Sequence, residues 1–192
     1  WNPDAPEEET LTATSYPLRA VVGDAPAAEL GGGNATSLLE LRNRTTDDIE
    51  TYVVPGPRAD DIDSAADVRR LRADGAMTSG TEVSTEDALV AEIRASGVSG
   101  VLRNHTDAAG LNTTEGFLAE SGEAEGAWTF RLNETDLGPN VDPYSGSLDT
   151  TNTRVHADQA NDTYWLAIDV DQVPELQTGD ALVANFTTYE RD

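Results

Sequence analysis

Asparagines in the Asn-x-Thr pattern are the side chains of this sequence with the clearest chemical meaning. Seven of the ten asparagines are followed two positions later by threonine, whereas chance would supply roughly two Asn-x-Ser/Thr matches. The pattern is the acceptor motif for N-linked glycans, which are attached at exposed backbone of exported proteins. We therefore predict an extracellular, cell-surface protein that carries covalent N-glycans. The predicted acceptors are Asn34, Asn43, Asn104, Asn112, Asn133, Asn161 and Asn185.

Strand periodicity tests three of these acceptors, because a glycan cannot point into a core. The apolar residues of 127–133 share one face of the predicted strand, and Asn133 lies on the other face. Asn185 likewise lies opposite the apolar residues of 181–189. Asn43 is in phase with the leucines that precede it, so that strand must end just before Asn43 for the site to be used.

The chain contains few of the residue types that catalysis and metal binding usually need. There are two histidines, His105 and His156, and no cysteine, so a histidine-based metal site, a catalytic triad and a disulfide framework are not predicted. The chain is not predicted to be an enzyme or to hold a cofactor. Asp60, Asp61 and Asp63 offer the oxygen ligands that Ca²⁺ or Mg²⁺ prefers. A solvated acidic surface is the favoured interpretation, because 36 acidic residues cluster by chance.

The net charge excludes several classes of partner. The chain carries −24 formal charges, and all 12 basic residues are arginine, so binding to nucleic acid or to anionic lipid is not expected. No stretch reaches the roughly 18 apolar residues of a membrane span, which predicts no membrane insertion of this segment. Adaptation to molar salt explains the charge, because the Debye length falls to about 3 Å at 1 M.

Alternating apolar and polar residues between turn signals predict short strands, and two segments have the pattern of helices. Residues 64–73 fit a helix that begins after Ser64 as its N-cap, and residues 114–120 fit a second short helix. Segment 88–95 is ambiguous but is interpreted as a strand, and 97–100 as an ordinary turn. The predicted strands are 10–22, 37–42, 49–54, 88–95, 127–133, 153–157, 163–170 and 181–189.

These elements predict a mainly β fold, an Ig-like β-sandwich with one or two short inserted helices. We expect a single sandwich domain over 10–192, with a helical insertion at about 58–85. An extended N-terminal arm or strand is expected over 1–14, in a chain that starts at Trp1 without methionine and is therefore expected to be a mature or excised part.

The N-terminal arm is predicted to contact another copy of the chain. Leu11 and Ala13 give it one modestly apolar strand face, and Trp1 has no core of its own nearby in sequence. A strand added to a neighbour's sheet, with Trp1 in a pocket, would offset the cost of ordering the arm. An intramolecular edge strand beginning near residue 10 is the alternative.

Five segments carry a resemblance to a known family. They are DSAADVRRL (63–71), EDALV (86–90), ASGVSGVL (95–102), NDTYWLAID (161–169) and GDALVANFT (179–187). Together they resemble haloarchaeal surface glycoproteins with S-layer-type β domains, over roughly 60–190. The resemblance implies a structural subunit of an extracellular assembly, an S-layer lattice or a filament, whose partners are copies of itself. A monomeric cell-surface binding or adhesion module is the alternative.

Overall fold

The chain divides into two compact units, Trp1–Asn43 and Arg44–Asp192, which we call unit 1 and unit 2. The computed structural model describes residues 14–20, 35–40, 43–121, 126–135, 148–173 and 176–189. Residues 1–13 of the predicted N-terminal arm lie outside the described residues, so the arm stays a prediction.

Unit 1 contains an antiparallel hairpin of β1 (Ser15–Ala20) and β2 (Ala35–Glu40). Both strands fall within or beside the predicted segments. Leu38 and Leu39 of β2 are 60% and 37% exposed. Consecutive leucines point to opposite faces of a strand, and such a pattern is typical of strands that are buried on both faces. A two-stranded hairpin is at best marginally stable by itself. Packing of a further surface against these strands would therefore stabilise the hairpin.

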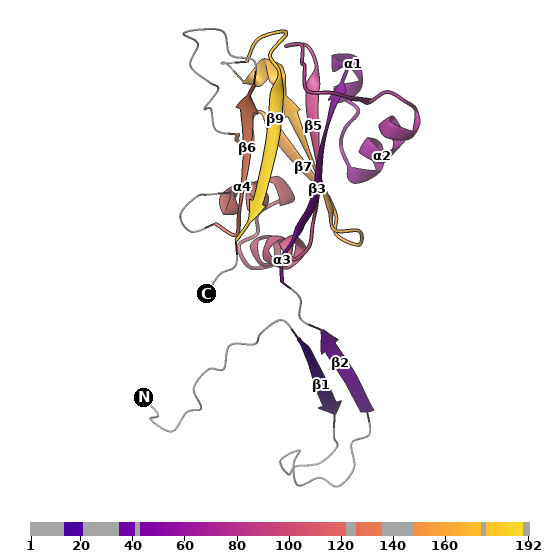
Figure 1. The fold of residues 1–192 in the computed structure, drawn as a ribbon, viewed down its shortest axis with the longest axis vertical. Helices are drawn as coiled ribbons and strands as arrows, with labels where there is room; N and C mark the ends of the chain where they lie inside the picture. Colours follow the sequence, from indigo (N-terminus) through magenta and orange to yellow (C-terminus); the bar gives the residue numbers. More distant parts are fainter. Residues whose placement is uncertain are drawn as a thin grey trace. The chain divides into compact units, whose positions relative to one another are not determined.

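Unit 2 is mainly β, as predicted (Figure 1). Five antiparallel strands form one sheet in the order β4-β3-β5-β8-β7, and β6 and β9 form a second, two-stranded sheet. This arrangement is compatible with the predicted sandwich. The elements are β3 (Thr46–Val54), α1 (Gly56–Ala59), α2 (Ala65–Ala73), β4 (Thr78–Ser79), β5 (Ala88–Ala95), α3 (Val98–Ala108), α4 (Thr113–Glu120), β6 (Trp128–Glu134), β7 (Thr153–Asp158), β8 (Thr163–Asp169), the 3-10 turn η1 (Val170–Gln172) and β9 (Leu182–Thr188).

The larger core lies between the five-stranded sheet and the β6–β9 pair, and a group of aromatic rings lies within it. Phe117 of α4 is stacked on Phe186 and tilted against Trp128, with ring centroids 6.1 and 5.2 Å away. The Trp128 Nε1–H donates to the backbone oxygen of Phe117 at 3.2 Å. Burying this indole therefore leaves its N–H with a partner.

The smaller core lies on the other face of the same sheet, under α2. Figure 1 shows α1 and α2 on one side of the five-stranded sheet and β6 and β9 on the other. Val68 and Leu71 of α2 pack onto Val90 and Trp165. Ser64 caps the helix as predicted, because its Oγ accepts from the backbone N–H of Asp67.

α3 corrects the sequence analysis, which interpreted 97–100 as a turn. Gly97 has φ +76° and stands at the N-cap of the helix, and a Cβ there would meet the Cγ of Arg44 at 2.5 Å. Val98 and Leu102 then fall on one buried helix face. Gly97 and Gly100 lie at the two ends of the first helical turn and led to the prediction of a turn. Val98 and Leu102 are four residues apart, which is the spacing of one helix face.

The first residue of unit 2 lies next to the residue that follows its last described strand. The Arg44 guanidinium donates from Nη1 to the backbone oxygen of Tyr189 at 3.2 Å. Arg44 opens the unit, and Tyr189 directly follows β9, the last strand described. Among the helices in the described ranges, none is long and apolar enough to cross a membrane.

Candidate functional site

The sequon asparagines of the described residues are all exposed. Asn43, Asn104, Asn112, Asn133, Asn161 and Asn185 have open side chains. β2 ends at Glu40, before Asn43, which meets the condition set for that acceptor. Asn34 and the predicted assembly residues Trp1, Leu11 and Ala13 lie outside the described residues.

Two sequons share the outer face of the β6–β9 pair. Asn133 is opposite Val183 in the register, and Asn185 is opposite Arg131. The two asparagines are therefore diagonal neighbours on one face, within reach of long side chains or of attached sugars. Val183 between them is 39% exposed, so glycans here would cover an apolar side chain that the protein leaves open.

Two sequons lie on helices. Asn104 is in the middle of α3, and Asn112 is the N-cap of α4. The Oδ1 of Asn112 accepts from the N–H of Glu115 at 2.9 Å, and the Glu115 carboxylate accepts from the N–H of Asn112. This capping box uses only the oxygen of the Asn112 amide. The side-chain nitrogen of Asn112, which is the atom that a glycan modifies, takes no part in this capping box.

Asn161 lies in the turn between β7 and β8 and is held by its neighbours. Its Nδ2 donates to Asp158 Oδ2 at 2.8 Å, and Arg69 of α2 donates to the same oxygen. The hydrogen bond from Asn161, together with the Arg69 charge, lowers the pKa of Asp158 below its ordinary value. This acceptor is therefore tied to helix α2 through one carboxylate.

A charged network fills the face of the sheet next to α2. Glu92 of β5 is only 4% exposed, and its two oxygens accept from Arg72 at 2.5 Å and from Arg94 at 2.6 Å. Glu50 of β3 accepts from the Tyr52 hydroxyl at 2.6 Å. That hydrogen bond lowers the pKa of Glu50, and burial, with the same bond, raises the pKa of Tyr52 to about 12.

Sequence reasoning did not find this network, although a signal was present. Glu92 and Arg94 alternate with the apolar residues of β5, and Glu50 and Tyr52 alternate in the same way on β3. In the antiparallel register Glu92 is opposite Glu50. Two facing carboxylates on a covered sheet face require cations between them, and α2 carries three arginines within its nine residues.

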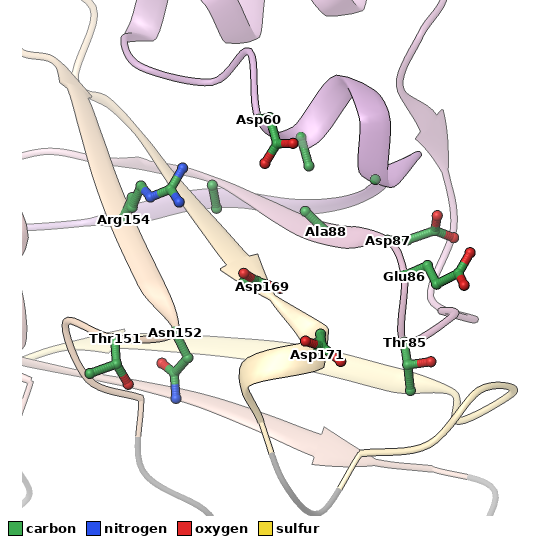
Figure 2. Close-up of a pocket in the computed structure, with 13 residues that line it drawn as sticks. Asp60, Thr85, Glu86, Asp87, Ala88, Thr151, Asn152, Arg154, Asp169 and Asp171 are labelled. Carbon is green, nitrogen blue, oxygen red and sulfur yellow. The ribbon is translucent and has the colours of Figure 1, made fainter.

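A polar cavity of about 380 Å³ opens at one end of the five-stranded sheet (Figure 2). Figure 2 shows Asp60, Asp169 and Arg154 around one opening, with Glu86 and Asp87 at its other side. Its lining includes five carboxylates and one arginine, so it repels anions. Within the described part of the chain, no group of three or more histidine, aspartate or glutamate side chains is placed to hold a metal ion.

The chain is similar in sequence to three curated proteins from salt-loving archaea. It is 29% identical over 178 residues to Cell surface glycoprotein 1 of Haloarcula hispanica, covering 86% of this chain and 19% of the relative. It is 28% identical over 189 residues to Cell surface glycoprotein 2 of the same organism, covering 92% and 20%. It is 25% identical over 201 residues to the cell surface glycoprotein of Haloferax gibbonsii, covering 97% and 21%.

The chain thus spans about a fifth of the length of these relatives. No family model and no solved structure matches it. The names of the relatives point to a structural rather than a catalytic role, and they agree with a chain in which most asparagines head a sequon. The chain is therefore homologous to the cell surface glycoproteins of haloarchaea, and its place is the extracellular cell surface.

Proposed function

We propose that the chain is a structural, N-glycosylated subunit of an extracellular assembly, an S-layer lattice or a filament, built from copies of itself. The observation that carries the proposal is the placement of the sequons. All six that fall on described residues are exposed, on strands, helices and turns of different parts of the chain. A structural protein with glycans on several faces must make its contacts through the surface that remains.

The copies are proposed to join through sheet edges and the N-terminal arm. β2 pairs only with β1 among the described strands, and it exposes Leu38 and Leu39. A strand from another copy would satisfy edge N–H and C=O groups and cover these leucines. Within the arm, Trp1, Leu11 and Ala13 are the proposed contacts.

The high negative charge is proposed to be an adaptation to molar salt. At −24 on 192 residues, carboxylates on one subunit repel those on the next. The Debye length is about 3 Å at 1 M salt and about 10 Å at 0.1 M. Assembly should therefore weaken when salt is diluted, and any divalent-ion site would show itself as rescue by millimolar Ca²⁺ at constant ionic strength.

Electron microscopy and sedimentation at molar salt test the assembly. We expect ordered particles much larger than 20.4 kDa. Freely diffusing single chains at every concentration would contradict the proposal and favour the alternative, a monomeric binding or adhesion module.

Deleting residues 1–9 tests the role of the arm. The deletion also removes four acidic residues, so the matched control keeps the arm and replaces those four by their amides. We expect the deletion to abolish assembly with the monomer fold intact, while the control assembles. Assembly of the deletion variant at the concentration that the parent chain needs would exclude the arm as a contact.

Intact-glycopeptide mass spectrometry of native material tests the sequons. We expect glycan at four or more of the seven, including Asn133 and Asn185, because these lie on the outer face of one sheet. Unmodified asparagine at most sites would contradict glycosylation as the reason for the sequons.

A further inference from the structure

The glycan acceptor motif is defined at two positions, so a transferase must reach two side chains at once. The asparagine supplies the nitrogen that is modified. The requirement for serine or threonine two residues later means that the enzyme also contacts this hydroxyl. Exposure of the asparagine alone therefore does not make a sequon usable. The five sequons that lie wholly within unit 2 differ in where the fold places the threonine.

The two sequons of the β6–β9 pair present both side chains on one exposed face. Residues two apart on a strand point to the same side. Asn185 and Thr187 are both on β9, and both are exposed. Asn133 is on β6, and Thr135, directly after β6, is also exposed. The Thr135 hydroxyl makes an exposed bond of 3.2 Å to the backbone oxygen of Ala181. An enzyme can displace that bond without disturbing the sheet.

The Asn161 sequon has an exposed asparagine and a buried threonine. Thr163 is 7% exposed, and its Oγ1 donates to the backbone oxygen of Asn161 at 3.0 Å. Thr163 is the first residue of β8, where it is paired with Arg94 of β5 and with Asp158 of β7. Reaching this hydroxyl requires the ends of both strand pairs to open, which is a rare event for a strand that is paired on both sides.

The Asn112 sequon is used by the fold itself. The Thr114 hydroxyl accepts the backbone N–H of Val155 at 2.9 Å, which ties the start of α4 to the edge strand β7. The Oδ1 of Asn112 accepts from the N–H of Glu115 at 2.9 Å. Both side chains of the motif therefore hold the first turn of the helix in place. A transferase that grips them must release these bonds.

The Asn104 sequon lies within α3, where the two motif positions diverge. Each residue of a helix turns by about 100°, so side chains two residues apart point to nearly opposite sides. Thr106 is therefore on a different side of α3 from Asn104, and its hydroxyl donates to the backbone oxygen of Arg103 at 3.2 Å. One enzyme site cannot hold both side chains while the helix is intact.

We propose that unit 2 has two classes of glycan acceptor. Asn133 and Asn185 accept glycan in the folded chain, whereas Asn104, Asn112 and Asn161 accept it only before unit 2 folds. The proposal rests on the proposed glycosylation and adds an order to it. A chain that folds before it meets the transferase would carry glycan on the β6–β9 face and lack it on α3, on α4 and in the turn between β7 and β8.

The chemical step is the same at every site. The side-chain nitrogen of asparagine forms a bond to the anomeric carbon of a lipid-linked sugar phosphate. The bond from that carbon to the phosphate oxygen breaks, and its electron pair leaves with the lipid phosphate. The nitrogen loses one proton to a base of the enzyme. The two classes therefore differ in access and not in the reaction.

The test offers the transferase a chain that has already folded. The full chain is made in a host without N-glycosylation and is incubated at molar salt with haloarchaeal membranes that hold an oligosaccharyltransferase and its lipid-linked donor. Glycopeptide mass spectrometry measures the rate at each site. A synthetic peptide spanning each sequon gives the rate for the same residues without the fold. We expect the ratio of chain rate to peptide rate to be at least tenfold larger at Asn133 and Asn185 than at Asn104, Asn112 and Asn161.

A destabilised variant tests whether folding is the cause. Phe117→Ala removes a fully buried ring and increases the population of unfolded chain. We expect it to raise the rate at Asn161 at least tenfold, while the rate at Asn185 changes less than twofold. Ser79→Ala, at an exposed position of β4, is the control and should change neither rate.

The outcomes separate the order of glycosylation from glycosylation itself. Equal ratios at Asn161 and Asn185 overturn the two classes. A folded chain that is modified at neither Asn133 nor Asn185, although the peptides are, overturns them as well. An unchanged rate at Asn161 in Phe117→Ala shows that folding does not restrict this site. If membranes that modify an unrelated Asn-x-Thr peptide modify none of the peptides from this chain, the proposed glycosylation itself fails.

Discussion

The two faces of the five-stranded sheet are covered by different chemistry. On one face, α3, α4 and the β6–β9 pair enclose a core that contains the rings of Phe117, Trp128 and Phe186. On the other face, α2 covers fewer apolar residues, and the buried carboxylate of Glu92 with its arginines fills the remainder. The first face is stabilised by removing apolar area from water, and the second also by pairing charges that neither partner could bury alone.

The two covered faces also differ in what they present to solvent. The aromatic face presents to the outside the strands and helices that bear most sequons. The α2 side presents Arg69 and Arg72. Each guanidinium lies over an aromatic ring and pairs with a carboxylate, and about half of each side chain is open to solvent.

The largest expected effect comes from the aromatic core. Phe117→Ala should lower the free energy of unfolding by about 4 kcal/mol, because the fully buried ring leaves a cavity against Trp128. Urea unfolding at fixed molar salt measures it. The control Val183→Ala removes an exposed side chain from the same half of the unit and should change stability by less than about 0.5 kcal/mol. A loss below about 1 kcal/mol for Phe117→Ala would contradict the assignment of the core.

Glu92→Gln tests the charged face. It should lower the free energy of unfolding by about 3 kcal/mol, since Arg72 and Arg94 lose their shared buried partner. The control Glu50→Gln removes a half-exposed carboxylate from the same network, and we expect less than about 1 kcal/mol. Equal losses for the two variants would show that burial of Glu92 does not matter. Urea titration at molar salt distinguishes these cases.

Tyr52 makes the charged face sensitive to alkali. Its pKa is raised to about 12 from an ordinary value of 10.0, so the neutral phenol is favoured in the folded chain. The resulting stability is complete below pH 10 and is lost as the pH rises from 10 through 12. Because a tenfold change in an equilibrium corresponds to about 1.4 kcal/mol, the free energy of unfolding of the parent chain should fall by about 2 kcal/mol more than that of Tyr52→Phe across this range. Urea unfolding at a series of pH values measures the difference, and parallel pH profiles for the two chains would contradict it.

The smallest expected effect is at the start of α2. Ser64→Ala removes the acceptor for the Asp67 N–H and should destabilise the chain by about 1 kcal/mol. Ser64→Asp, which retains a capping oxygen, should restore most of the loss. Ser79→Ala in β4 is the control, because Ser79 is exposed. Thermal unfolding at molar salt suffices, and identical midpoints for Ser64→Ala and the parent chain would contradict the cap.

The features of this fold that depend on residues close together in sequence could be predicted from the sequence. The cap of α2 and the strand phases of Asn133 and Asn185 follow from spacing alone, and the structure confirms both. The ambiguity of 88–95 has a structural cause. β5 is central and covered on both faces, so seven of its eight residues are buried. The apolar Ala88 and Val90 share a face with Glu92 and Arg94, which blurs the alternation.

Other features depend on contacts that are distant in sequence. Glu92 is buried because Arg72, twenty residues earlier, reaches it from a helix, and no local pattern contains that pairing. α3 begins at a glycine that also leaves room for Arg44, so its start is set by tertiary contact as well as by helix propensity.

The hydrogen bond between Arg44 and Tyr189 has a mechanical consequence for a protein at the cell surface. Because the first residue of unit 2 and the end of its last strand are bound to each other, tension on the chain enters and leaves the unit at one point. A pull applied to Arg44 and Tyr189 would load this hydrogen bond before it reached the strand pairs of the two sheets.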